Sequence, residues 1–130
     1  MASKPWEVSA FRRKRFSAGT VIFDEGDLGD EVYLVTEGAV EIRRGTRSDN
    51  PRTLARLGKG DFFGELALFD SAPRMATVLA VEPTVCNIIS REEFNKRLQE
   101  MDPVMRGITT LMVRRVRRLT DEVVLRKKGR

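Results

Sequence analysis

Short apolar runs separated by glycines occupy the middle of the chain, from Phe16 to Ile89. Polar and apolar positions alternate clearly where Val40 and Ile42 are flanked by Glu41 and Arg43. Turn residues recur about every 8 to 12 positions, which leaves no room for the helices of parallel βαβ units. The pattern therefore predicts an antiparallel β-barrel or jelly roll over about residues 16–89. Its strand-like runs are residues 20–23, 32–35, 39–42, 53–57, 77–81 and 85–89.

After Ile89 the apolar positions change to a helical period. Ser90 and Glu93 have the spacing of a capping box, which predicts a helix beginning at Ser90. Asp102 followed by Pro103 is a second helix start, because Asp caps the helix and Pro is tolerated in the first turn. An apolar stripe then predicts a helix of about 20 to 25 residues. Its members are Met105, Ile108, Met112, Val116, Leu119 and Val123. The two C-terminal helices are expected over about residues 90–126.

The N-terminal part of the chain predicts less. Trp6 and Phe11 are spaced as in a short helix, so an N-terminal helix is expected before the barrel. The basic run Arg12–Arg15 is typical of a solvated face or an edge strand. The acidic stretch Asp24–Glu31 lacks the ligand spacing and terminal glutamate of an EF-hand, and Asp with Gly is typical of tight turns. We therefore expect no metal site there.

Composition narrows the class of protein. A chain of 130 residues is expected to form one domain, residues 1–130, that folds without disulfides or metals. It has no apolar run of the ~20 residues needed to cross a bilayer and no signal-peptide core, so a cytoplasmic location is expected. Cys86 is the single cysteine and is expected to be a small buried hydrophobe. Histidine is absent, which removes His-based nucleophile pairs and most zinc and iron sites. We expect no enzyme activity, cofactor or metal.

The net charge of +5 is concentrated at the C-terminus. Residues 106–130 hold nine Arg or Lys and two acidic residues, a net charge of +7. Residues 1–105 hold fifteen Arg or Lys and seventeen acidic residues, a net charge of −2. One alternative is therefore a fragment of a transcription regulator whose basic tail binds nucleic acid. A single Arg-rich helix supplies electrostatic attraction without a recognisable reader of bases, so nucleic acid is not the expected partner.

Candidate chemistry lies in residues 62–78. Gly64 gives the backbone freedom to turn, and residues 65–68 are expected to form one helical turn whose first N–H groups attract an anion. Arg74 follows ten residues after Gly64, and a guanidinium matches phosphate geometry with paired donors. Glu65 is able to accept hydrogen bonds from vicinal hydroxyls. These residues fit a phosphate-plus-ribose ligand, although Glu65 and Arg74 fit a structural ion pair equally well.

A resemblance favours the ligand. Residues 63–68, then Pro73 and Arg74, then Ala76 to Val78 closely resemble the phosphate-binding cassette of cyclic-nucleotide-binding domains, such as those in protein kinase A regulatory subunits. Residues 19–26, 32–38 and 60–64 resemble the same family's strands and turns, so that the resemblance covers roughly residues 6–125. It implies a regulatory sensor module that binds a cyclic nucleotide in this cassette.

The resemblance also implies roles for single residues. Glu65 is expected to hold the ribose 2′-hydroxyl, and Arg74 to pair with the cyclic phosphate. The full set of expected ligand-binding residues is Gly64, Glu65, Leu66, Ala67, Arg74, Met75, Ala76 and Thr77. Backbone N–H groups around Leu66, Ala67 and Ala76 are expected to meet phosphate oxygens or nearby ribose, and Thr77 to add a hydroxyl contact. Leu66 is also suited to the core, and Thr77 to a strand.

Met75 bears on the choice of base. Members of the family that prefer cGMP often place a threonine directly after the cassette arginine, where its hydroxyl meets guanine. Methionine has no such donor, so cAMP is the expected ligand and cGMP the alternative.

In this family the helices after the barrel move on ligand binding. The apolar stripe of residues 105–123 suits a lid over the base, packing against a partner helix in a homodimer or effector, or docking on the barrel. No aromatic residue follows Phe94, so an aliphatic or arginine side chain is expected to cap the base. A degenerate module without ligand is a further alternative. A cupin-type enzyme needs histidine ligands that the chain lacks.

Overall fold

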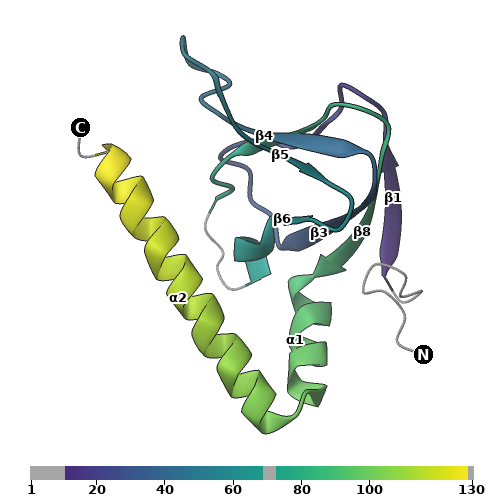
Figure 1. The fold of residues 1–130 in the computed structure, drawn as a ribbon, viewed down its shortest axis with the longest axis vertical. Coiled ribbons are helices and arrows are strands. Elements are labelled where there is room, and N and C mark those ends of the chain that lie inside the picture. Colours follow the sequence, from purple (N-terminus) through teal and green to yellow (C-terminus); the bar gives the residue numbers. More distant parts are fainter. Residues whose placement is uncertain (1–10, 69–72, 129–130) are drawn as a thin grey trace. The chain divides into compact units, whose positions relative to one another are not determined.

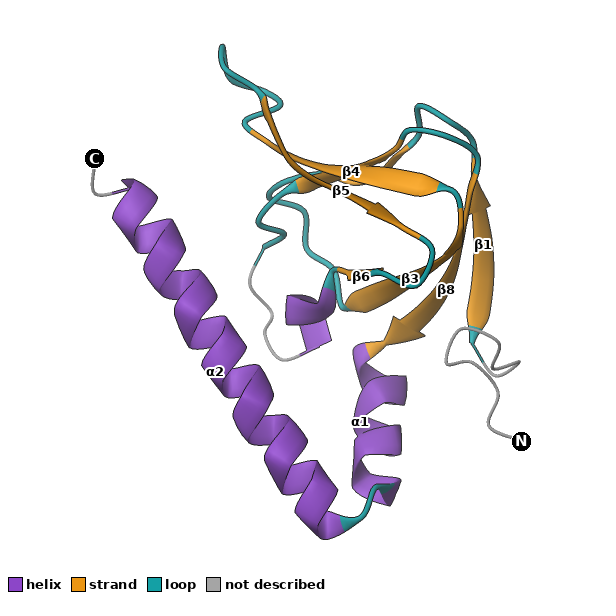
Figure 2. Cartoon of the chain, viewed as in Figure 1, coloured by secondary structure: helices purple, strands orange, loops and turns teal. Residues whose placement is uncertain are grey.

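The computed structural model describes residues 11–68 and 73–128. The expected N-terminal helix falls largely on residues 1–10, outside the described residues. Figures 1 and 2 show antiparallel strands followed by two helices. In chain order the elements are β1 (Arg12–Phe16), β2 (Val21–Phe23), β3 (Glu31–Glu37), β4 (Ala39–Arg44), β5 (Arg52–Gly58), β6 (Phe62–Phe63), the 3₁₀ helix η2 (Glu65–Leu68), β7 (Thr77–Ala80), β8 (Thr84–Ser90), α1 (Arg91–Glu100) and α2 (Pro103–Lys128). All six predicted runs are strands, and no boundary differs by more than two residues.

Two four-stranded antiparallel sheets build the barrel. One sheet has the order β1-β8-β3-β6 and the other the order β2-β7-β4-β5, so neighbours in the sheet are often distant in the chain. In the second sheet Val40 lies opposite Leu57 on one side and Ala80 on the other, which aligns their apolar side chains. This arrangement confirms the predicted antiparallel β-barrel of the jelly-roll kind.

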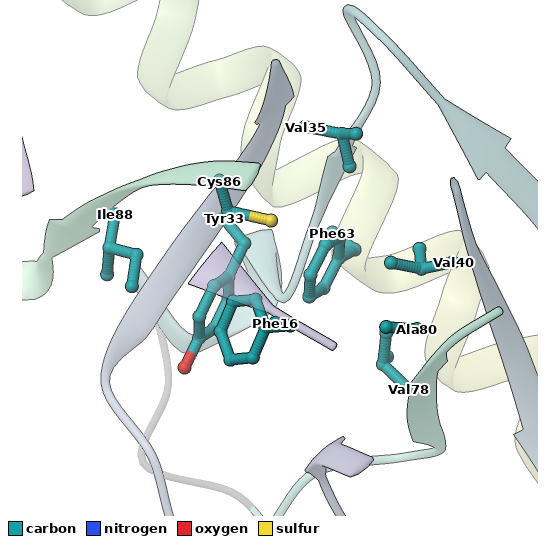
Figure 3. Close-up of a cluster of buried hydrophobic side chains, with 9 residues drawn as sticks. All are labelled: Phe16, Tyr33, Val35, Val40, Phe63, Val78, Ala80, Cys86 and Ile88. Carbon is teal, nitrogen blue, oxygen red and sulfur yellow. The ribbon is translucent and has the colours of Figure 1, made fainter. Parts of the chain in front are cut away.

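Side chains from both sheets meet in one apolar core. Its buried members are Phe16, Tyr33, Val35, Val40, Phe63, Val78, Ala80, Cys86 and Ile88 (Figure 3). The inner strands β3 and β8 each have a neighbour on both edges, and consecutive residues along them are buried. Neither strand therefore alternates strictly between apolar and polar residues: residues 32–35 are a continuous apolar run, and within residues 85–89 only Asn87 is polar.

Cys86 lies in this core and is fully buried. Burial raises the pKa of its thiol to about 12, so the side chain stays protonated at neutral pH. A protonated, inaccessible thiol is a poor nucleophile and a poor metal ligand. The prediction that Cys86 is a small buried hydrophobe is therefore confirmed.

The basic run forms the edge strand β1, as one of its two interpretations predicts. Residues 12–15 are exposed, and Phe16 is the first residue of the strand to enter the core. Arg12 forms an ion pair with Glu31, and Arg13 lies 3.9 Å from Glu37. Charged side chains on an edge discourage pairing with another chain, so the run has a structural explanation.

The chain divides into two compact units, residues 1–91 and 92–130. In the second unit α2 begins where the sequence predicts it, because the Asp102 carboxylate accepts the N–H groups of Val104 and Met105 at 3.0 and 3.1 Å. Five members of the predicted apolar stripe of α2 are exposed: Met105, Ile108, Met112, Val116 and Leu119. In the described part of the chain, no helix is long and apolar enough to cross a membrane.

Candidate functional site

The turn predicted after β6 is present as the 3₁₀ helix η2. Gly64 precedes it with a φ of +78°, a conformation that L side chains rarely adopt. A Cβ atom at this position would also lie 2.8 Å from Nη1 of Arg74 and 3.1 Å from the carbonyl oxygen of Glu31. Both the backbone conformation and the lack of space therefore require glycine at the start of the cassette.

Arg74 is buried, with 8% of its surface exposed, and its guanidinium lies beside Gly64. Nη1 donates to the carbonyl oxygen of Gly64 at 3.2 Å, and Nη2 donates to the carbonyl oxygen of Glu31 at 2.9 Å. The ring of Phe23 covers the guanidinium at 4.1 Å from its centroid. The structure thus brings the predicted phosphate clamp to the predicted turn.

The charge of Arg74 has no carboxylate partner within ion-pair distance in the described residues, and its buried Nε has no hydrogen-bond partner there. Burial lowers the pKa of Arg74, because a charged group loses solvation. Tyr33 in its ionised form and the nearby carboxylates raise the pKa of Arg74 in opposition; the carboxylates belong to Glu31, Asp30 and Asp27. A buried cation with unused hydrogen-bonding capacity favours an anionic ligand.

The acidic stretch is a turn, as expected, and it anchors the backbone of Arg74. The N–H of Gly26 donates to the carbonyl of Arg74, and the N–H of Arg74 donates to the carbonyl of Asp27, each at 2.8 Å. Asp27 also closes its own turn, because its carboxylate accepts the N–H of Asp24 at 2.9 Å. Within residues 11–68 and 73–128, no cluster of acidic or cysteine side chains is arranged to hold a metal.

Glu65 is exposed at the first position of η2. No ion pair joins Glu65 to Arg74 in the described residues, because Nη1 and Nη2 of the arginine bond to backbone carbonyls instead. The structure therefore gives no support to the alternative in which these two residues form a structural ion pair. A role for Glu65 toward ribose stays a prediction.

The other predicted residues lie around the same turn. Ala67 is buried, and its N–H donates to the carbonyl of Gly64 at 3.2 Å, so the protein itself uses one of the predicted phosphate donors. Met75 and Ala76 are half-buried immediately before β7. The side chain of Leu66 lies outside the described residues.

Thr77 is buried with its hydroxyl in a polar network. The hydroxyl accepts the N–H of Glu25 at 2.9 Å, lies 3.2 Å from the hydroxyl of Thr46, and lies 3.4 Å from the Asp24 carboxylate. The Glu25 carboxylate in turn accepts the N–H of Gly45 at 2.9 Å. Thr77 therefore ties β7 to the turn before β3 and to the β4–β5 hairpin, and its contact with a ligand stays a prediction.

Sequence reasoning missed Glu31, Phe23 and Arg91 at the site. Glu31 contributes a carbonyl oxygen, which residue identity does not reveal, and Gly64, which was predicted for its turn, contributes another. Phe23 stood in a run that indicated only a strand, and Arg91 in a helix start. Arg91 donates from Nε to the carbonyl of Ala67 at 2.9 Å, and its N–H donates to the carbonyl of Asp30 at 2.8 Å. For Phe23 and Arg91 the available signal was chemical, because one is a bulky aromatic and the other a cation, each next to a turn.

Comparisons with known proteins identify relatives of this chain. Over 118 residues the chain is 36% identical to the cyclic AMP receptor protein of Thermus thermophilus, covering 91% of this chain and 55% of that protein. The chain thus spans about half the length of that relative. The EAL enzyme Bd1971, in its half-site-occupied form, has a TM-score of 0.76 at 31% identity, covering 85% of this chain and 99% of that chain. The regulatory domain of Toxoplasma gondii PKA, crystallised with cAMP, has a TM-score of 0.65 at 30% identity, and the match covers 82% of this chain and 40% of that chain.

Residues 13–101 match the family described as "Cyclic nucleotide-binding domain". The match includes both sheets from Arg13 onward, the cassette and α1, and it is to this family rather than to cupin enzymes. The nucleic-acid alternative depends on the basic residues of 106–130, and the side chains of 120–130 lie outside the described part of the chain. Since more than half of the chain matches, and since the barrel agrees with the match, the chain belongs to the cyclic nucleotide-binding domain family.

Proposed function

We propose that this chain is a regulatory module, not an enzyme, that binds cAMP in its cassette. The observation that carries this proposal is the buried guanidinium of Arg74, held beside the η2 turn without a carboxylate partner in the described residues. Its present acceptors are neutral carbonyl oxygens. A phosphate offers a full negative charge and paired oxygens that match the guanidinium, which neutral carbonyls do not, so exchange of these partners for a ligand phosphate is favourable.

Glu65 is the proposed ribose contact. Its carboxylate is exposed at the start of η2 and is not joined to Arg74, whose guanidinium lies next to Gly64. A carboxylate is an acceptor only, so it suits a hydroxyl rather than a phosphate. We assign it to the ribose 2′-hydroxyl, with the N–H groups around Leu66 and Ala76 toward the phosphate or the nearby ribose.

The base is the least constrained part of the ligand. Met75 is half-buried directly after Arg74 and offers no donor comparable to a threonine hydroxyl. The relative Bd1971 has structures with cAMP bound and with cGMP bound, so that protein takes both bases. We propose cAMP as the preferred ligand on the chemistry of Met75, with cGMP as the weaker one.

We further propose that ligand binding moves the C-terminal helices. Arg91 is the first residue of α1, and its side chain bonds to the carbonyl of Ala67 in η2. The same residue is tied through its N–H to Asp30, which lies next to the carbonyl partner of Arg74. A change in η2 on ligand binding therefore acts directly on the residue at which α1 begins.

The exposed apolar stripe of α2 supplies the proposed partner surface. Five of its side chains are 46 to 62% exposed: Met105, Ile108, Met112, Val116 and Leu119. Contiguous exposed apolar surface is a mark of interaction sites. We propose a second copy of this chain as the occupant, because like stripes form an isologous interface.

The first prediction concerns Arg74. Arg74→Ala removes charged hydrogen bonds worth about 1.5 to 3 kcal/mol, so it should weaken cAMP binding roughly 10- to 150-fold. Calorimetric titration with cAMP and cGMP measures the loss, the preference for cAMP, and whether the chain binds nucleotide at all. Arg13→Ala is the control, because Arg13 is an exposed arginine on β1. Unchanged affinity in Arg74→Ala would place the phosphate elsewhere, and a chain that binds neither nucleotide would be a degenerate module.

The second prediction separates ribose from phosphate. Glu65→Ala should weaken cAMP roughly tenfold or more, since a hydrogen bond to a charged group is lost, but should change the affinity for 2′-deoxy-cAMP less. The same titration measures both ligands, with Glu37→Ala as an exposed control on β3. Equal losses for the two ligands would contradict the ribose assignment.

The third prediction concerns Arg91. With a fluorescent donor on β5 and an acceptor on α2, the energy-transfer efficiency of the wild-type protein should change on saturation with cAMP. In the Arg91→Ala variant, saturation with cAMP should change this efficiency by less than half as much. The reason is loss of the bond between Arg91 and Ala67. Arg97→Ala is the control on α1, where Arg97 pairs with Glu93. A full response in Arg91→Ala would exclude this route, and no response in the wild type would exclude the movement.

The fourth prediction concerns α2. Met112→Lys places a charge in the middle of the exposed stripe and keeps a good helix former. Sedimentation should show a dimer for the wild type and a monomer for this variant. Arg114→Ala, outside the stripe, should stay dimeric. A wild type that is monomeric at all concentrations would rule out the homodimer and leave an effector helix or a lid as the occupant.

A further inference from the structure

Arg74 lies in a niche that other parts of the first unit build around it. Its backbone forms two hydrogen bonds with the turn at residues 26–27, each 2.8 Å long. Its guanidinium bonds to the carbonyls of Glu31 on β3 and Gly64 before η2. Both the backbone and the side chain of the arginine are therefore held partly by residues outside the cassette, at positions 26, 27 and 31.

An aromatic cluster forms one wall of this niche. The Phe23 ring lies 4.1 Å from the guanidinium carbon of Arg74. Phe23 itself contacts Tyr33 and Phe63, with ring centroids 5.8 and 5.9 Å away. Tyr33 and Phe63 stack in parallel at 4.9 Å and belong to the buried core. The ring under the cation thus rests on residues that do not move independently of the core.

Gly29 forms another wall of the niche. A Cβ atom at this position would lie 2.6 Å from Nη2 of Arg74 and 2.8 Å from its Nε. Gly29 does not have a positive φ, so the backbone conformation does not require glycine here. The close approach of the guanidinium is the reason that the position has no room for a side chain.

We propose that Phe23 and Gly29 are positioning residues, which hold the Arg74 guanidinium in place for the phosphate before the ligand arrives. This inference rests on the proposed function, and it adds residues outside the cassette to the phosphate site. A cation over an aromatic face is stabilised by the ring quadrupole, more strongly where water is excluded. Ordering a long arginine side chain in advance reduces the entropy lost on binding, so affinity rises without any contact between Phe23 and the ligand.

A double-mutant cycle tests whether Phe23 acts through Arg74. Phe23→Leu keeps apolar volume and removes the ring, and should weaken cAMP roughly 3- to 30-fold. In an Arg74→Ala background the same change should alter affinity less than twofold, because its route to the ligand is gone. Phe16→Leu is the control, because Phe16 is a core aromatic on β1, which belongs to the sheet that does not contain Phe23. Equal losses from Phe23→Leu in both backgrounds would overturn the proposal.

Gly29→Ala tests the same niche by crowding alone. The added methyl group displaces the guanidinium, so cAMP should bind roughly tenfold more weakly or worse. Gly58→Ala is the matched control, because its added Cβ finds no atom closer than 3.8 Å and its φ is not positive. Wild-type affinity in a folded Gly29→Ala variant would contradict the assignment.

A measurement without ligand separates this inference from the proposed function. Phe23→Leu and Arg74→Ala should each lower the midpoint temperature of thermal unfolding of the ligand-free chain. The two decreases added together should exceed the decrease in the double variant by roughly 2 to 6 °C. Additive losses would overturn the niche, whatever the ligand is. If the coupling is present and no cyclic nucleotide binds, the niche stands as a structural pair, and both its role in ligand binding and the proposed function are wrong.

Discussion

The buried positive charge of Arg74 imposes its requirements on several distant parts of the chain. Removing a guanidinium from water costs several kcal/mol unless its donors are satisfied, and no carboxylate in the described residues pairs with it. Two backbone carbonyls and one aromatic face offset this cost. A side chain at position 29 would collide with the guanidinium, and one at position 64 would collide with it and with a carbonyl oxygen. One cation therefore explains the lack of side chains at Gly29 and Gly64 and the position of the aromatic ring of Phe23.

The same constraint explains why this arrangement suits a ligand. A guanidinium with five donors uses two of them on neutral oxygens, and its buried Nε is unpaired. A fully paired buried cation would gain little from a phosphate, and an exposed one would lose much entropy in binding it. Arg74 lies between these extremes: fixed in place by packing and short of charged acceptors. Affinity for an anion follows from that incomplete satisfaction.

The barrel was predictable because burial leaves a pattern in the sequence. Alternation at Val40 and Ile42 and the cap at Asp102 both act locally, so the strands and the start of α2 are where the sequence predicts them. The cassette turn was predictable for the same reason. The hydrogen-bond partners of Arg74 were not predictable, because they are backbone carbonyls, which every residue carries whatever its side chain. Thr77 is the opposite case. The sequence predicts a ligand contact for its hydroxyl, and in the fold this hydroxyl bonds to Glu25 and Thr46.

The link between the cassette and α1 has a magnitude that suits regulation. Hydrogen bonds from a charged donor contribute about 1.5 to 3 kcal/mol, and allosteric coupling energies are typically about 1 to 3 kcal/mol. The single bond from Arg91 to the carbonyl of Ala67 is therefore of the size needed to bias an equilibrium of the helices. In the proposed movement, a ligand that shifts η2 strengthens or breaks this bond. The proposal therefore assigns control of the response to Arg91, the residue at which α1 begins.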